Sequence, residues 1–114
     1  MFQSNKKIKF LHIDNNQLIS LDEHVFKNLK SLEHLFLDNN KIEFLEPELF
    51  KDLINLIILE LGANNIKYLH PNQFDHLEKL EVLFLYENQI KDLDPGIFSK
   101  LSLLKYLRHV EYGS

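Results

Sequence analysis

The strongest constraint on the fold of this chain is a repeat of 24 residues. Steps of 24 from Ile8 meet only aliphatic residues, at Leu32, Leu56, Leu80 and Leu104. Seven further columns keep their residue type over four repeats in the same way. The eight columns begin at Ile8, Leu11, Ile13, Asn16, Leu18, Leu21, Phe26 and Leu29. Such a period is typical of a solenoid, in which each repeat packs on its neighbours and like residues stack into ladders.

Four complete repeats occupy residues 8–31, 32–55, 56–79 and 80–103, so the eight columns contain 32 positions, and all 32 obey the pattern. The three prolines, Pro47, Pro71 and Pro95, also lie 24 residues apart. We assign residues 1–7 to an N-terminal flank, 8–103 to the four repeats, and 104–114 to a partial fifth repeat or a C-terminal cap.

The order of residues within each repeat indicates its path. Leu35 and Leu37 alternate with polar or variable positions, as in a strand with one buried face. The remainder of the repeat is long enough for the crossover that parallel pairing requires. An asparagine such as Asn40 follows each strand, where its amide can bond the backbone of its own turn and of the adjacent repeat. The phenylalanine column fills the far side of the coil, where its rings stack as a spine.

Each repeat reads L-x-x-L-x-L-x-x-N-x-L, then x-x-L, four variable residues, F and x-x-L. This motif resembles the leucine-rich repeat family, in its 24-residue form common in extracellular receptors and adhesion proteins, over residues 8–108. The resemblance implies an α/β solenoid, a right-handed coil with a parallel concave β-sheet of about five strands. We expect a mostly irregular or 3₁₀ convex side, with short turns around residues 25–30, 49–54, 73–78 and 97–102.

The ends of a solenoid need covers, and receptor-type members of the family usually carry cysteine-rich caps, whereas this chain has no cysteine. Phe2 could cover the first layer. At the other end the pattern breaks, because His109 stands where leucine is expected and Tyr112 where asparagine is expected. We favour a fragment of a longer repeat array, with a natural polar cap as the alternative.

The variable strand positions should project onto the concave face as three rows. Their predicted partner-binding residues are Phe10, His12, His34, Phe36, Ile58, Glu60, Val82, Phe84, Tyr86, Tyr106 and Arg108. Strands about 4.8 Å apart make this surface roughly 20 Å across. A contiguous apolar patch usually marks an interaction surface, and aromatic residues beside an arginine are typical of binding hot spots. The alternatives are lateral packing of these side chains, or a homodimer through the concave face or the uncapped ends.

Two further features of this face have competing interpretations. Gly62 and Ala63 could leave a notch for a partner, although a neighbouring ring such as Tyr86 more often leans over such a gap. His12 and His34 adjoin Asp14 and Asp38, with Glu60 beyond, which is the one candidate constellation for a metal or catalytic centre. Because the surface is open and no periodic metal motif occurs, we interpret these groups as solvated polar surface and predict no metal and no cofactor.

The residue types argue against several other functions. No serine lies on the strand rows near the histidines, and three glycines form no phosphate-binding loop, so we predict no enzyme. Thirteen basic residues against 17 acidic ones disfavour nucleic-acid binding. No segment is apolar for long enough to insert in a bilayer. The remaining partners are a protein or peptide ligand, or a second copy of the chain.

The compartment follows from the resemblance alone. Residues 1–10 lack the apolar core of a signal peptide, which fits either an intracellular protein or an excised part of a larger one. The resemblance implies an extracellular origin and protein recognition, often of innate-immune, adhesion or developmental ligands. A cytoplasmic protein is the alternative.

Overall fold

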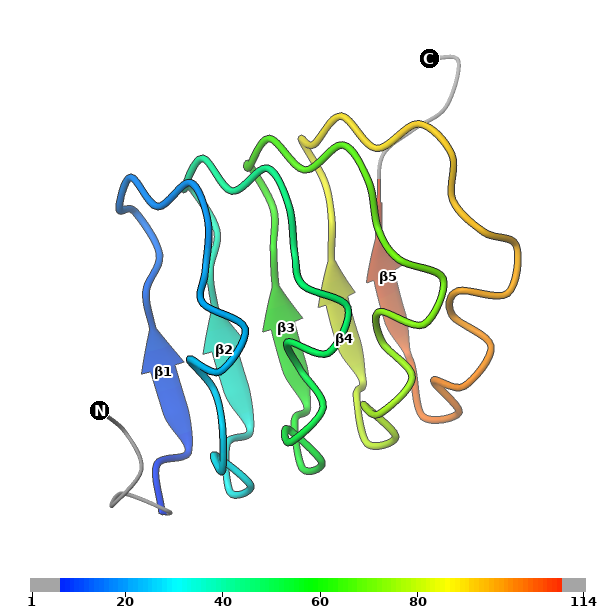
Figure 1. The fold of residues 1–114 in the computed structure, drawn as a ribbon. Helices are drawn as coiled ribbons and strands as arrows, with labels where there is room; N and C mark the ends of the chain where they lie inside the picture. The colour runs from blue at the N-terminus through cyan, green and yellow to red at the C-terminus, as the bar shows by residue number, and fades with distance from the viewer. Residues whose placement is uncertain (1–6, 110–114) are drawn as a thin grey trace.

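One strand forms at the start of each repeat in the computed structural model, which describes residues 7–109 (Figure 1). The strands within this range are β1 (Phe10–His12), β2 (His34–Phe36), β3 (Ile58–Glu60), β4 (Val82–Phe84) and β5 (Tyr106–Arg108). They pair in parallel and in chain order, with Leu11 opposite Leu35 and each later pair likewise 24 residues apart. The predicted five-stranded parallel solenoid is therefore confirmed.

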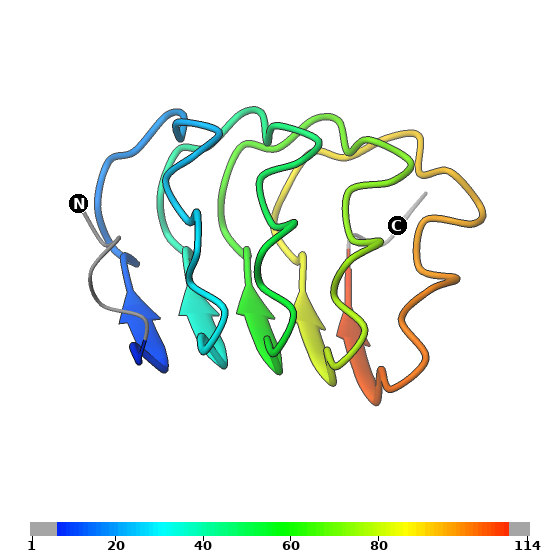
Figure 2. The ribbon, with the colours of Figure 1, turned by 60° about the horizontal axis from the view of Figure 1, so that its bottom comes forward.

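The opposite layer of the coil consists of successive β-turns, and residues 7–109 contain no helix (Figure 2). In the second repeat the amides of Leu49, Lys51 and Leu53 each donate to the carbonyl three residues earlier, at 3.0–3.2 Å. Pro47 occupies the second position of the first of these turns, where its fixed φ is favoured. The turns cover residues 23–28, 47–52, 71–76 and 95–100, about two residues before the expected positions.

The sequence columns form the core between these two layers. Leu35, Leu59 and Leu83 are fully buried in the strands, while the residues on either side of them face outward. The four rings of the phenylalanine column stack with centroids 6.1–6.4 Å apart, as the spine interpretation predicts. The layers at the two ends are more open, since Ile8, Leu11 and Leu104 are only partly buried.

The asparagine column ties each repeat to the one before it. Asn64 donates from Nδ2 to the carbonyls of Leu61 and Gly62 in its own turn and to that of Leu37 in the preceding repeat, at 3.1–3.2 Å. Its Oδ1 accepts the amide of Ile42 at 3.1 Å. Asn40 and Asn88 repeat this pattern. Each side chain thus satisfies backbone groups that the chain reversal would otherwise leave unpaired in the core.

Some predictions concern residues outside the described range. The proposed cover by Phe2 and the pattern break at Tyr112 both lie there. The division of the chain into flank, repeats and partial fifth repeat stays a prediction.

The asparagine ladder predicts very different costs for two chemically identical changes. Asn64→Ala leaves the buried amide of Ile42 without its acceptor, whereas the carbonyls of Leu37 and Leu61 keep the bonds from Asn40 and Asn88. It should therefore lower the free energy of unfolding by about 1–3 kcal/mol, the cost of one buried group left unpaired. Asn16→Ala is the matched control, because Asn16 is exposed and, among residues 7–109, its side chain bonds only the carbonyls of Ile13 and Asp14. It should cost under about 1 kcal/mol. If urea denaturation showed that both variants lose the same free energy of unfolding, this role of the ladder would be contradicted.

Candidate functional site

The outward positions of the five strands and of the residues just after them form one continuous surface, which we call the open sheet face. It contains all eleven predicted site residues together with Asp14, Asp38 and Gly62. Strand pairing arranges them in rows: Phe10, His34, Ile58, Val82 and Tyr106 form the first, and His12, Phe36, Glu60, Phe84 and Arg108 the second. Phe10 and Tyr106 are 56% and 66% exposed, so the two ends of the face are the most accessible.

Aromatic contacts organise the β1–β2 end of the open sheet face. The His12 and Phe36 rings stack with centroids 4.5 Å apart. The Phe10 and His34 rings meet edge to face, with centroids 4.7 Å apart. His12 Nδ1 also lies 3.6 Å from Asp14 Oδ1. The histidines therefore pack laterally on phenylalanine rings.

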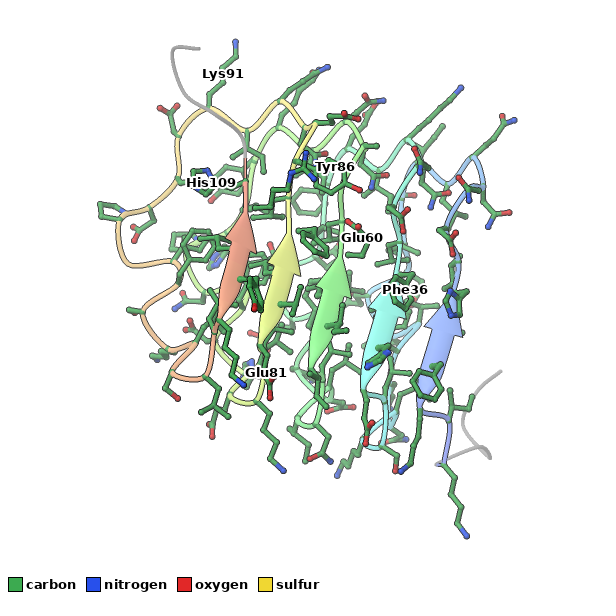
Figure 3. The ribbon with its side chains drawn as sticks, turned by 180° about the vertical axis from the view of Figure 1, so that it is seen from behind. Phe36, Glu60, Glu81, Tyr86, Lys91 and His109 are labelled. Atoms are coloured by element: carbon green, nitrogen blue, oxygen red, sulfur yellow. The ribbon has the colours of Figure 1, made fainter. Side chains whose placement is uncertain are left out.

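The centre of the face is a packed group of Glu60, Gly62, Tyr86 and Arg108. Figure 3 labels Glu60 and Tyr86 of this group. The Tyr86 ring lies directly over Gly62, where any Cβ would overlap it. The Tyr86 hydroxyl donates to Glu60 Oε2 at 3.1 Å, and the Gly62 amide donates to Glu60 Oε1 at 2.8 Å. The Arg108 guanidinium lies over the Tyr86 ring, 4.6 Å from its centroid. This is a cation–π contact with β5.

Burial changes the ionisation of both acidic groups in this centre. Desolvation raises the pKa of the Glu60 carboxyl, and the nearby Asp38 charge raises it further, while the bonds from Gly62 and Tyr86 and the Arg108 charge oppose that rise. Burial, followed by the charge of Glu60, raises the pKa of the Tyr86 hydroxyl to about 12. Tyr86 thus remains a hydrogen-bond donor at neutral pH.

Two sequence interpretations of this face can now be judged, and one contact on it was not foreseen. The gap at Gly62 is filled by Tyr86, as the neighbouring-ring alternative predicted, so it is no open notch. Solvated polar surface is wrong for Glu60, which is 8% exposed because Tyr86 covers it. The stacking of Arg108 on Tyr86 was missed, although their positions in adjacent repeats and the pairing of an aromatic ring with a cation were available signals.

Within residues 7–109, no three histidine or carboxylate side chains are grouped closely enough to hold a metal ion. Over the same residues, no helix has the length and apolar character needed to cross a bilayer. Shallow hollows occur on the turn side, one of them beside Glu23, Lys27 and Asp52, away from the open sheet face.

Comparison with known proteins identifies the repeat type. The model of the leucine rich repeat family matches the chain in three overlapping segments, residues 6–66, 31–90 and 54–108. Together these segments span nearly the whole chain. A search of curated proteins found no match.

The contact of Tyr86 with Gly62 predicts a strong coupling between these two positions. The backbone of Gly62 is not in the left-handed region, so an alanine there would not be strained by its φ angle. Gly62→Ala therefore acts only through the overlap of its Cβ with the Tyr86 ring. It should lower the free energy of unfolding by about 1–3 kcal/mol in the native chain, because the ring and its bond to Glu60 must move. In a Tyr86→Ala background the same change should cost much less. Urea denaturation of the four proteins measures this coupling, and equal costs in both backgrounds would refute it.

The raised pKa of Glu60 predicts a pH-dependent contribution to stability. The folded state binds the Glu60 proton more tightly than the unfolded state, so the free energy of unfolding falls as pH rises from the ordinary value of 4.5 through the folded pKa. Glu60→Gln removes this decline, and its stability relative to the native protein should rise with pH over that window.

Urea denaturation at several pH values tests this expectation. Tyr86→Phe is the companion variant, because loss of a hydroxyl that lowers the pKa of Glu60 should extend the decline to higher pH. A difference between Glu60→Gln and the native protein that stays constant over this window would show that Glu60 ionises equally easily in both states.

Proposed function

Because the chain belongs to the leucine-rich repeat family, we propose that it is a non-catalytic protein-binding module whose open sheet face recognises a protein or peptide partner. Leucine-rich repeat domains commonly serve as protein-binding modules and are typically non-catalytic. The observation that carries the proposal is the concentration of aromatic and aliphatic side chains on this one face, where solubility alone would favour polar residues.

The accessibility of these side chains supports the proposal. Phe10 and Tyr106 are exposed, and Phe36, Val82 and Phe84 are half-buried, so all five retain surface that a partner could cover. Their backbone is held by parallel pairing and by the asparagine ladder. A partner therefore meets a surface whose rows are already in place, which reduces the entropy lost on binding.

The chemistry of the face favours binding over catalysis. Glu60 is bonded to Gly62 and Tyr86, and His12 is stacked on Phe36. An enzyme would instead need such groups to converge on a shielded pocket. The face also bears more carboxylates than cations, which disfavours a nucleic-acid partner.

Two aspartates in place of the phenylalanines in the second row of the face should strongly weaken binding. The bait is the native chain, and the probe is a displayed library of random peptides long enough to cross the five strands, about eight residues or more. Phe36→Asp with Phe84→Asp should weaken selected peptides about tenfold or more, because it places two charges in the apolar contact. Equilibrium binding to immobilised peptide measures the change.

The matched control is Phe44→Asp with Tyr68→Asp. These aromatic residues are 45% and 50% exposed outside the open sheet face, so the control should bind normally. Thermal unfolding checks that both double variants are folded. Binding that survives the Phe36 and Phe84 changes contradicts the proposal. A native dimer in light scattering that only the Phe36 and Phe84 changes dissociate would favour the alternative, a self-associating solenoid.

A further inference from the structure

The charges on the open sheet face are uneven. Among its described residues are three carboxylates, Asp14, Asp38 and Glu60, against one guanidinium, Arg108, which gives a net charge of −2 with the histidines neutral. The charged residues before the strands do not offset this imbalance, since Lys9 pairs with Glu33 at 3.8 Å and Lys105 with Glu81 at 3.4 Å. A partner that covers the apolar rows therefore approaches an acidic surface.

Arg108 shows how this face already holds a cation. Its guanidinium lies 4.6 Å from the centroid of the Tyr86 ring, while the hydroxyl of that ring donates to Glu60. An aromatic face next to a carboxylate is a favourable environment for a planar guanidinium. The chain thus supplies its own cation on the β5 side of the centre.

On the β2 side of the centre there is also an aromatic ring and a carboxylate, but no cation is paired with that carboxylate. Asp38 follows β2, and within residues 7–109 no lysine, arginine or histidine lies within ion-pair distance of its carboxylate, which accepts only the Asn39 amide at 3.3 Å. Phe36 lies on the strand that leads to Asp38 and is opposite Glu60 in register. Figure 3 shows Phe36, Glu60 and Tyr86 following one another across the strands.

We propose that the partner of the open sheet face is a peptide segment that combines apolar residues with an arginine or lysine, whose charge pairs with Asp38 beside the Phe36 ring. This inference rests on the proposed function and specifies the partner. The apolar neighbours of the basic residue cover Ile58, Val82 and Phe84, and the Asp38 charge meets a cation as that contact excludes water.

Charge also distinguishes this partner from a second copy of the chain. Two open sheet faces brought together would each carry the same net charge of −2. A symmetric contact would bring two such acidic surfaces together, and like charges facing one another in a contact are unfavourable. A basic apolar segment removes the repulsion that a second copy would add.

The experiment uses the peptides selected on the native chain. They should be enriched in arginine or lysine next to apolar residues. Asp38→Asn should weaken them about tenfold, as expected when a charge-assisted bond becomes a neutral one. Replacement of the peptide arginine by its uncharged analogue citrulline should have a similar effect. Asp92→Asn is the matched control, because it removes one charge from an exposed residue outside the open sheet face and should leave affinity unchanged.

The outcomes separate this inference from the function on which it rests. Selected peptides without basic residues, or equal effects of Asp38→Asn and Asp92→Asn, overturn the basic partner. If Phe36→Asp with Phe84→Asp still abolishes binding of those peptides, the binding face itself stands. Failure to select any peptide that depends on Phe36 and Phe84 counts against both. A native dimer that the Phe36 and Phe84 changes dissociate would identify a second copy as the occupant and overturn the inference.

Discussion

The hydrogen bonds of the asparagine ladder are the interaction on which the rest of this structure depends. Each strand is only three residues long, so strand pairing alone holds little of each repeat. Where the chain reverses, the Asn64 side chain donates to three carbonyls and accepts one backbone amide, and two of these four partners belong to the preceding repeat. This link keeps successive repeats in register, and the register in turn stacks the leucine and phenylalanine columns into one core.

The same register determines the surface. Because like positions lie opposite one another on adjacent strands, a residue type repeated every 24 positions becomes a row, and a change of type becomes a local feature of that row. The centre of the open sheet face shows the consequence. Gly62 replaces the Asp38 of the previous repeat, Tyr86 from the next repeat covers the space, and Glu60 becomes buried beneath it. The Tyr86 side chain thus fills the space that Gly62 leaves in the preceding repeat.

This arrangement gives the proposed binding face two halves of different character. On the β3–β5 side, Arg108, Tyr86 and Glu60 already form a packed set of cation, ring and carboxylate. On the β1–β2 side, the rings of His12 and Phe36 stack, and the one polar side-chain partner of Asp38 in the described part of the chain is the Asn39 amide. The first half is a rigid, satisfied support, whereas the second leaves charge and aromatic surface available. The basic residue of the proposed partner is therefore expected to lie near the end of β2, at Asp38.

The sequence by itself determined the architecture, because a 24-residue period fixes which residues stack whatever the local details. Leu35, Asn40 and Phe50 could be assigned to strand, turn and spine, and the outward rows of the face followed from alternation. Tertiary structure alone decided the burial of Glu60 and the stacking of Arg108 on Tyr86. These contacts join side chains 22–26 residues apart, and their form depends on rotamers and on the space above Gly62. A periodic pattern specifies backbone neighbours, but the direction in which an outward side chain leans is set by the space and partners around it.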